Sequence, residues 1–137
     1  MVNPVVHLIG TVLQAARPVG DSGLWHFEFS GEIVLGTESP WRLVSKDRME
    51  LGSQDHGQKF GHAQEVNAPA FITSLLGASE VVQAEVIEPS GDLHISFANG
   101  MQLHVVAISS GYEAWQLNGP GAREVIRTGG GKTWKID

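Results

Sequence analysis

The chain repeats itself, and this internal repeat limits its fold more than any other feature of the sequence. Residues 8–16 (LIGTVLQAA) resemble residues 75–85 (LLGASEVVQAE), and residues 24–31 (LWHFEFSG) resemble residues 93–100 (LHISFANG). The matched segments lie 67 to 70 residues apart. Because self-similarity at a fixed distance indicates repeated structural units, we expect two matching sub-structures packed about an approximate two-fold axis.

Both copies contain a pattern that predicts a β-hairpin. A three-residue loop at 98–100, with glycine at its left-handed position, pairs Ile95 with Leu103 and places the large apolar side chains of both strands on one face. The equivalent loop in the first copy pairs Phe27 with Leu35. A strand precedes each hairpin, because residues 11–17 and 80–88 are rich in β-branched and apolar side chains and are followed by turn-forming residues.

A short helix is predicted at the start of each copy. Asn67 is a favourable N-cap, Pro69 suits the first turn, and Gly77 suits a left-handed C-terminal stop, so we expect a helix over 68–76. The first copy carries a weaker version of this signal and predicts a turn or short helix over 4–9, because its β-branched valines disfavour a helix.

These elements together predict an α+β fold dominated by antiparallel sheet. The chain forms a single domain, residues 1–137, with two pseudo-symmetric β repeats at about 4–46 and 68–118 and one main short helix. Strands over 41–46 and 112–118 end the two copies, with Trp41 matching Trp115. The second copy alone is expected to add a C-terminal hairpin, 123–136, whereas residues 46–66 form a long polar connection.

The charge distribution favours a basic protein partner. The net charge is −6, and residues 1–121 hold thirteen acidic against five basic side chains. An acidic surface argues against direct nucleic-acid binding and speeds association with a basic partner, although it also serves solubility alone. The chain has no cysteine, no apolar run long enough to span a membrane and no secretory signal at its start, so we expect a cytoplasmic protein.

Few residues suggest chemistry. In the predicted hairpin, His94 faces His104 on the polar side of the sheet, where the pair is a weak candidate for a metal site and a stronger one for a cross-strand contact. The segment Gly131-Lys132-Thr133 lacks the glycine and the following helix of a phosphate-binding loop. No serine-nucleophile motif is present. We therefore expect no cofactor, and we lean against an enzyme.

Aromatic side chains are the remaining candidates for a binding surface. Tryptophans in a small domain can line a pocket or anchor a partner, but they can equally fill the core between the two copies. The set consists of Trp25, Trp41, Tyr112, Trp115 and Trp134.

The second half resembles a family of small bacterial proteins. The resemblance is carried by residues 93–100, by Tyr-Glu-Ala-Trp-Gln-Leu-Asn-Gly at 112–119, by the glycines at 129–131 and by Trp134. This family is classed as a domain of unknown function and is similar to proteins encoded beside bacterial toxins as immunity factors. The resemblance implies a non-catalytic protein that binds a toxin, and it carries over no catalytic residue.

We therefore predict a non-catalytic immunity-type protein that neutralises a basic toxin by direct contact. A small-molecule or metal-binding module and a small enzyme with an unmarked site are the alternatives, and a homodimer is also possible. The candidate partner-binding residues are acidic side chains in and near the connection together with three aromatic ones: Asp47, Glu50, Asp55, Glu65, Trp41, Tyr112 and Trp115.

Overall fold

A computed structural model describes residues 3–120, 124–128 and 133–136. The helix over 68–76 is confirmed as α1 (Ala68–Leu76): the Asn67 side chain accepts a hydrogen bond from the Ala70 N–H, and the Gly77 N–H bonds the Thr73 carbonyl. The predicted turn near the N-terminus is a short 3-10 helix, η1 (Val6–Leu8). The described residues otherwise form antiparallel strands, so the α+β prediction is confirmed.

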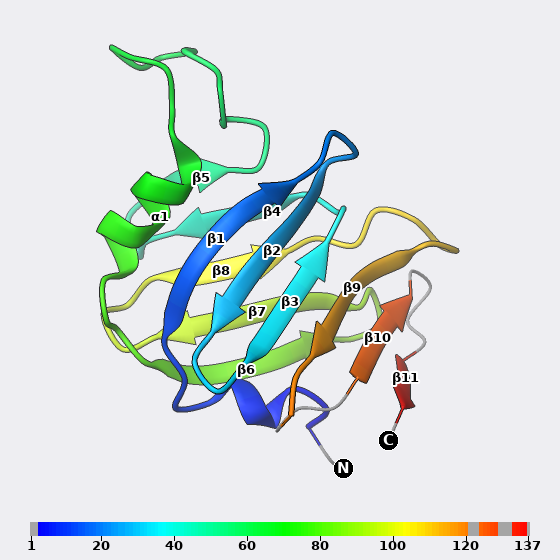
Figure 1. The fold of residues 1–137 in the computed structure, drawn as a ribbon. Helices are drawn as coiled ribbons and strands as arrows, with labels where there is room; N and C mark the ends of the chain where they lie inside the picture. The colour runs from blue at the N-terminus through cyan, green and yellow to red at the C-terminus, as the bar shows by residue number, and fades with distance from the viewer. Residues whose placement is uncertain (1–2, 121–123, 129–132, 137) are drawn as a thin grey trace.

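The strands form two sheets, each of which contains strands from both halves of the chain (Figure 1). The first sheet has the order β1-β2-β3-β9-β10-β11, and the second has the order β5-β4-β8-β7-β6. The strands of the first sheet are β1 (Leu13–Val19), β2 (Leu24–Phe29), β3 (Ile33–Thr37), β9 (Glu113–Asn118), β10 (Glu124–Thr128) and β11 (Thr133–Ile136). Those of the second are β4 (Trp41–Val44), β5 (Met49–Gly52), β6 (Val81–Ile87), β7 (Asp92–Phe97) and β8 (Gln102–Val105).

The pairing shows how the two copies are related. In each copy the first three strands form a meander in one sheet, and the fourth and fifth strands lie in the other sheet. Thus β4 pairs with β8 of the second copy, and β9 pairs with β3 of the first. The two copies are therefore joined by an exchange of their fourth and fifth strands.

The predicted hairpin registers are confirmed in both copies. Ile95 lies opposite Leu103, and Phe27 lies opposite Leu35, with all four side chains buried. Gly100 has a φ of +91°, which is the left-handed conformation required at the third position of the loop. The alternation of apolar and polar residues thus fixes which face of each hairpin enters the core.

One prediction about the ends of the copies was wrong, and another was right in part. Residues 46–66 are not only a connection, because they include β5, which pairs with β4. The predicted C-terminal hairpin is confirmed by the pairing of β10 with β11, but its first strand has a counterpart in the first copy, because β5 matches β10 in position; among the described residues only β11 lacks a counterpart. The glycine turn at 129–131 lies outside the described residues.

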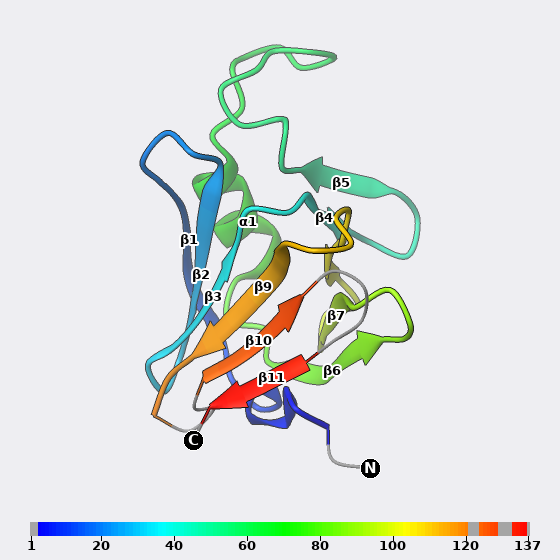
Figure 2. The same ribbon diagram turned by 90° about the vertical axis from the view of Figure 1, so that its right-hand side faces the viewer.

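The core lies between the two sheets and is rich in aromatic rings. Trp25 of β2 and Trp41 of β4 make an edge-to-face contact with centroids 4.9 Å apart, and Phe27 packs against Trp41 at 5.3 Å. Figure 2 shows the two sheets from the side, with α1 packed beside β1. Helix α1 buries Ile72 and Leu76 in the same core. Trp41 and Trp115 are only 2% and 1% exposed.

The matching tryptophans differ in how their indole N–H groups are satisfied. The Trp115 Nε1–H donates to the Gly91 carbonyl at 2.9 Å. The Trp41 Nε1 is buried and has no hydrogen-bond partner among the described residues. The two copies are thus alike in backbone and packing but not in their polar contacts.

Candidate pocket between strands β3 and β9

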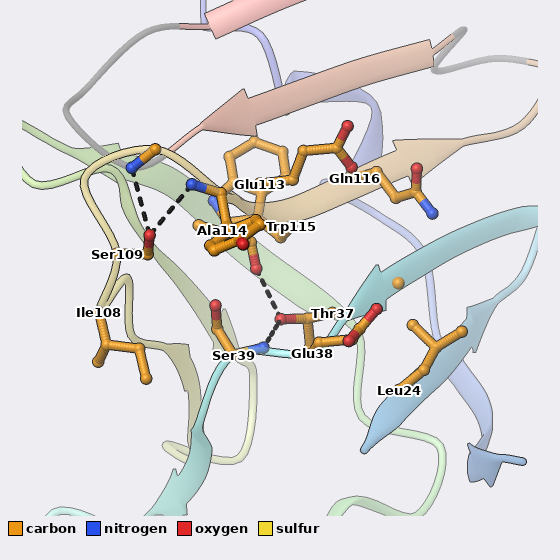
Figure 3. A pocket seen from close by; sticks show the side chains of 13 residues that line it. Leu24, Thr37, Glu38, Ser39, Ile108, Ser109, Glu113, Ala114, Trp115 and Gln116 are labelled. Atoms are coloured by element: carbon orange, nitrogen blue, oxygen red, sulfur yellow. Dashed lines mark hydrogen bonds between the residues drawn. The ribbon is translucent and has the colours of Figure 1, made fainter. Parts of the chain in front are cut away.

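A surface pocket lies where the end of β3 meets the start of β9 (Figure 3). Its volume is about 620 Å³, within the range of small-ligand and side-chain sites. One wall is the segment that follows β3, and the opposite wall is the loop that precedes β9. The lining residues are Leu24, Gly36, Thr37, Glu38, Ser39, Ile108, Ser109, Gly111, Tyr112, Glu113, Ala114, Trp115 and Gln116.

Thr37 ties the wall after β3 to β9. Its buried hydroxyl donates to the Ala114 carbonyl at 2.7 Å and accepts from the Ser39 N–H at 2.9 Å. These two hydrogen bonds attach residues 37–39 to β9, so the backbone of this wall is held in place. Glu38, between the two anchored residues, is left exposed.

Ser109 shapes the opposite wall. Its hydroxyl oxygen accepts from the N–H groups of Gly111 and Tyr112, at 3.2 and 3.1 Å, in a turn of the kind that serine forms with its own following backbone. The turn leaves Ile108 72% exposed and Tyr112 82% exposed. Large apolar groups held in the open on a hydrogen-bonded turn are typical of contact sites.

The pocket combines this apolar surface with negative charge. Glu38 from one wall and Glu113 from the start of β9 are both exposed, and neither has an ion pair among the described residues. The floor is made by β3 and β9, including buried Trp115, whose position the bond to Gly91 fixes. A Cβ at Gly36 would lie 3.3 Å from the Gln116 Nε2 atom, so a larger residue at this position would require the Gln116 side chain to shift.

Two of the predicted partner-binding residues meet in this pocket. Tyr112 forms its rim and Trp115 its floor. Three other lining residues were not predicted from the sequence: Glu38, Ile108 and Ser109. The one local signal for this wall is an isoleucine followed by the turn-forming residues Ser-Ser-Gly at 109–111, whereas Glu38 lies near this wall only because β3 pairs with β9.

The other predicted residues lie elsewhere. Trp41 is buried between the sheets, as expected if the tryptophans fill the core. Asp47 is exposed in the β4–β5 turn, Glu50 lies 3.7 Å from the guanidinium of Arg48, and Glu65 is exposed in the following connection.

Asp55 has a structural partner. Its carboxylate accepts from the Gly52 N–H at 2.8 Å, and its own N–H bonds the Gly52 carbonyl. The Ser53 N–H bonds the Trp41 carbonyl of β4. Because backbone groups of successive residues in a strand point to opposite sides, the N–H and C=O of Gly52 point to the outer edge of β5. Asp55 therefore occupies part of this sheet edge and limits strand pairing with another chain.

The histidine pair forms a polar network on the outer face of the second sheet. The rings of His94 and His104 stack with centroids 3.9 Å apart. The Arg42 Nε–H donates to His104 Nδ1 at 3.1 Å, so the His104 proton lies on Nε2, which bonds the Gln102 amide oxygen at 2.9 Å. Burial, followed by the neighbouring His94 and Arg42, lowers the pKa of His104 to about 4.

This network does not have the form of a metal site. Both ring nitrogens of His104 are engaged, one of them by a cationic guanidinium. Within the described ranges, no group of three or more histidine, aspartate or glutamate side chains is placed to hold a metal ion. In the same part of the chain, no helix has the length and hydrophobicity needed to cross a membrane.

Comparison with known proteins identifies the family but no function. Neither the curated proteins nor the solved structures gave a match to the chain. One family model, described as a family of unknown function (DUF6188), matches residues 15–135 and thus covers both sheets and the pocket. The chain belongs to this family.

Proposed function

We propose that this protein is a non-catalytic binding protein whose pocket between β3 and β9 takes an apolar, positively charged segment of a protein partner. The observation that carries the proposal is the joint presence, around one concavity, of an exposed tyrosine and isoleucine with two carboxylates that have no ion pair among the described residues. An aromatic or aliphatic side chain of the partner packs on Tyr112 and Ile108. A neighbouring lysine or arginine of the partner reaches Glu38 or Glu113.

Electrostatics and geometry support this class of partner. The chain has a net charge of −6, so a basic protein is attracted at long range before it docks. Interface hot spots are typically aromatic side chains in positions that docking desolvates, and Tyr112 is presented in such a position on an ordered turn. The pocket walls are held by backbone and hydroxyl bonds, which reduces the ordering cost of binding.

The biological form that we propose is an immunity-type protein that neutralises a basic toxin. Support comes from the acidic charge and from the resemblance of residues 112–119 to a family that is itself similar to proteins encoded beside toxins. In this form, the pocket would hold an apolar and basic part of the toxin and block its surface. The natural candidate for the partner is the product of the gene adjacent to that of this protein.

Titration calorimetry with the purified product of the adjacent gene tests the proposal. We expect a 1:1 complex that weakens as salt concentration rises. Tyr112→Ala should weaken it by about 1–3 kcal/mol, and Glu38→Gln combined with Glu113→Gln should slow association by about tenfold. Val82→Ser, which removes a half-exposed apolar side chain from β6, is the matched control and should bind as the wild type does.

Two results would reject the proposal. One is the absence of heat and of co-elution with that product at low salt. The other is a complex whose affinity is unchanged by Tyr112→Ala and by the double glutamate substitution. The second result would show that the partner binds to another surface of the protein.

The pocket volume also favours a second candidate, a small amphipathic cation such as an aromatic amine. A volume of about 620 Å³ suits such a ligand. Quenching or enhancement of Tyr and Trp fluorescence by a panel of aromatic amines would detect it. Saturable binding of an amine that Glu113→Gln abolishes would favour this candidate over a protein partner.

A further inference from the structure

The connection between β5 and α1 carries a projecting loop, residues 57–66, which we call the finger. Figures 1 and 2 both show it extending away from the two sheets. Its two ends are paired, because the Gly57 N–H bonds the Val66 carbonyl and the Val66 N–H bonds the Gln58 carbonyl, both at 2.9 Å. The finger is thus closed at its base by backbone hydrogen bonds.

The base of the finger is also fixed to the core. Val66 is buried, and the preceding His56 accepts a hydrogen bond from the Ala68 N–H at 3.0 Å. The His56 ring contacts Trp25 edge to face, with centroids 5.5 Å apart. These contacts attach the finger to the first turn of α1 and to a core tryptophan, so its direction is set by the fold.

The tip of the finger presents one large apolar side chain. The His62 N–H bonds the Lys59 carbonyl at 3.0 Å, which closes a four-residue turn, and Gly61 has a φ of +67° within it. Phe60 stands at the corner of this turn and is 80% exposed. Lys59 beside it is exposed and has no ion pair among the described residues.

The tip of the finger is complementary in charge to the pocket between β3 and β9, and both surfaces carry an exposed aromatic ring. It offers an aromatic ring next to a lysine, in a segment (58–64) that contains no acidic residue. The pocket offers Tyr112 and Ile108 next to the carboxylates of Glu38 and Glu113. Because the finger extends away from its own sheets, it does not fill the pocket of its own chain.

We propose that the finger of one molecule inserts Phe60 into the pocket between β3 and β9 of a second copy. The ring packs on Tyr112 and Ile108, and the Lys59 ammonium lies near Glu38 and Glu113. This contact joins two different surfaces, so it forms a closed assembly if the exchange is reciprocal and an open chain if it is not. It shares the pocket with the function proposed above but does not depend on the existence of a foreign partner.

Self-association through the finger would regulate binding of the partner. A basic partner and the finger of a second copy compete for the same pocket, so self-association lowers the concentration of free pockets. Binding of the partner releases single molecules. The finger thus acts as an internal substitute for the partner segment.

Analytical ultracentrifugation from low micromolar to near-millimolar concentration tests the contact. We expect the wild type to form species of twice the chain mass or larger, more so at low salt. Phe60→Ser and Tyr112→Ser should each weaken association by about tenfold or more, because each removes one side of the same apolar contact. Val82→Ser removes an exposed apolar side chain of β6, outside both surfaces, and should associate as the wild type does.

A charge exchange makes the test specific to these two surfaces. Lys59→Glu and Glu113→Lys should each weaken association, and the two variants should associate when they are mixed. A wild type that stays monomeric throughout, or an assembly unaffected by Phe60→Ser, overturns the proposal. Phe60→Ser should leave binding of the adjacent gene product intact, which separates failure of this proposal from failure of the proposed function.

Discussion

His104 shows how a single position distinguishes the two halves of the molecule. In the first half, Gly36 occupies the matching position, beside His26 and Gln116. In the second half, His104 lies between His94 and Arg42 and is 9% exposed. The fold therefore does not require an imidazole at this position, whereas the polar network requires a neutral one that accepts from Arg42.

The first prediction concerns pH. The pKa of His104 is lowered to about 4 in the folded protein, whereas an unfolded histidine titrates near its ordinary value of 6.5. The unfolded state therefore binds a proton that the folded state does not, and the free energy of unfolding falls as pH decreases from about 6.5 to about 4. Partial solvation makes this contribution about 1–2 kcal/mol. The pKa of His94 is lowered by burial as well and acts in the same direction.

Urea unfolding at several pH values measures this effect. His104→Asn should show a smaller loss of stability over that pH interval than the wild type, whatever its stability at neutral pH. The variant keeps the nearby carboxylates Asp92 and Glu85, so the two proteins differ only in the side chain at position 104. Equal pH dependence of the two proteins would show that His104 does not supply the difference.

Site residues could be predicted only where the signal was local. Tyr112 and Trp115 lie within one short segment whose aromatic residues stood out in the sequence. Trp115 proved to be a buried floor rather than an exposed contact. Glu38 lies 75 residues before Glu113 in the chain, and nothing near either residue indicates that β3 pairs with β9.

Among the elements, helix α1 and the two hairpins were predictable because their determinants are adjacent in sequence. The cap at Asn67, the proline and the terminal glycine define the helix without tertiary contacts. Strand β5 was missed because Met49–Gly52 contains two apolar residues between polar ones, too few for an alternating pattern. Its place depends on pairing with β4, and the outer edge is partly occupied by Asp55.

A glycine substitution tests the β7–β8 hairpin. Gly100→Ala should lower the free energy of unfolding by about 1–2 kcal/mol, because Gly100 has a φ of +91° and an L side chain is strained there even where space is open. Gly111→Ala is the matched control, since Gly111 lies in open space without a positive φ. Thermal unfolding compares the two variants, and equal melting temperatures would contradict the assigned loop conformation.

On the scale of the whole molecule, the exchange of strands makes the two halves dependent on each other. In isolation, the segment 1–66 would have β3 without β9 and β4 without β8, so two strand edges would lose their partners. The same applies to 67–137. We therefore expect neither half to fold alone and an equimolar mixture of the two to regain β structure and buried tryptophan.

Circular dichroism and Trp fluorescence of the separate and mixed halves measure this outcome. Cooperative unfolding of 1–66 alone would contradict it, because that result requires β4 and β5 to pack without the second copy. The overall symmetry was predictable from the repeat, but the exchange was not. The register of each hairpin is determined by residues within that hairpin. Whether the fourth strand pairs in its own sheet or in the other one depends instead on packing across the whole core.

The exchange of β4 and β9 also suggests a history for the chain. The arrangement is the one that a domain-swapped homodimer would have if its two subunits were joined in one polypeptide, with residues 53–67 as the covalent link. In such an ancestral dimer, every surface would occur twice. Once joined in one chain, the two sheets are free to differ: the first carries Tyr112 beside Glu38 and Glu113, whereas the second carries the stacked histidines. The pocket between β3 and β9 thus occurs once in each molecule rather than as a symmetric pair, so the proposed complex is expected to contain one partner for each chain.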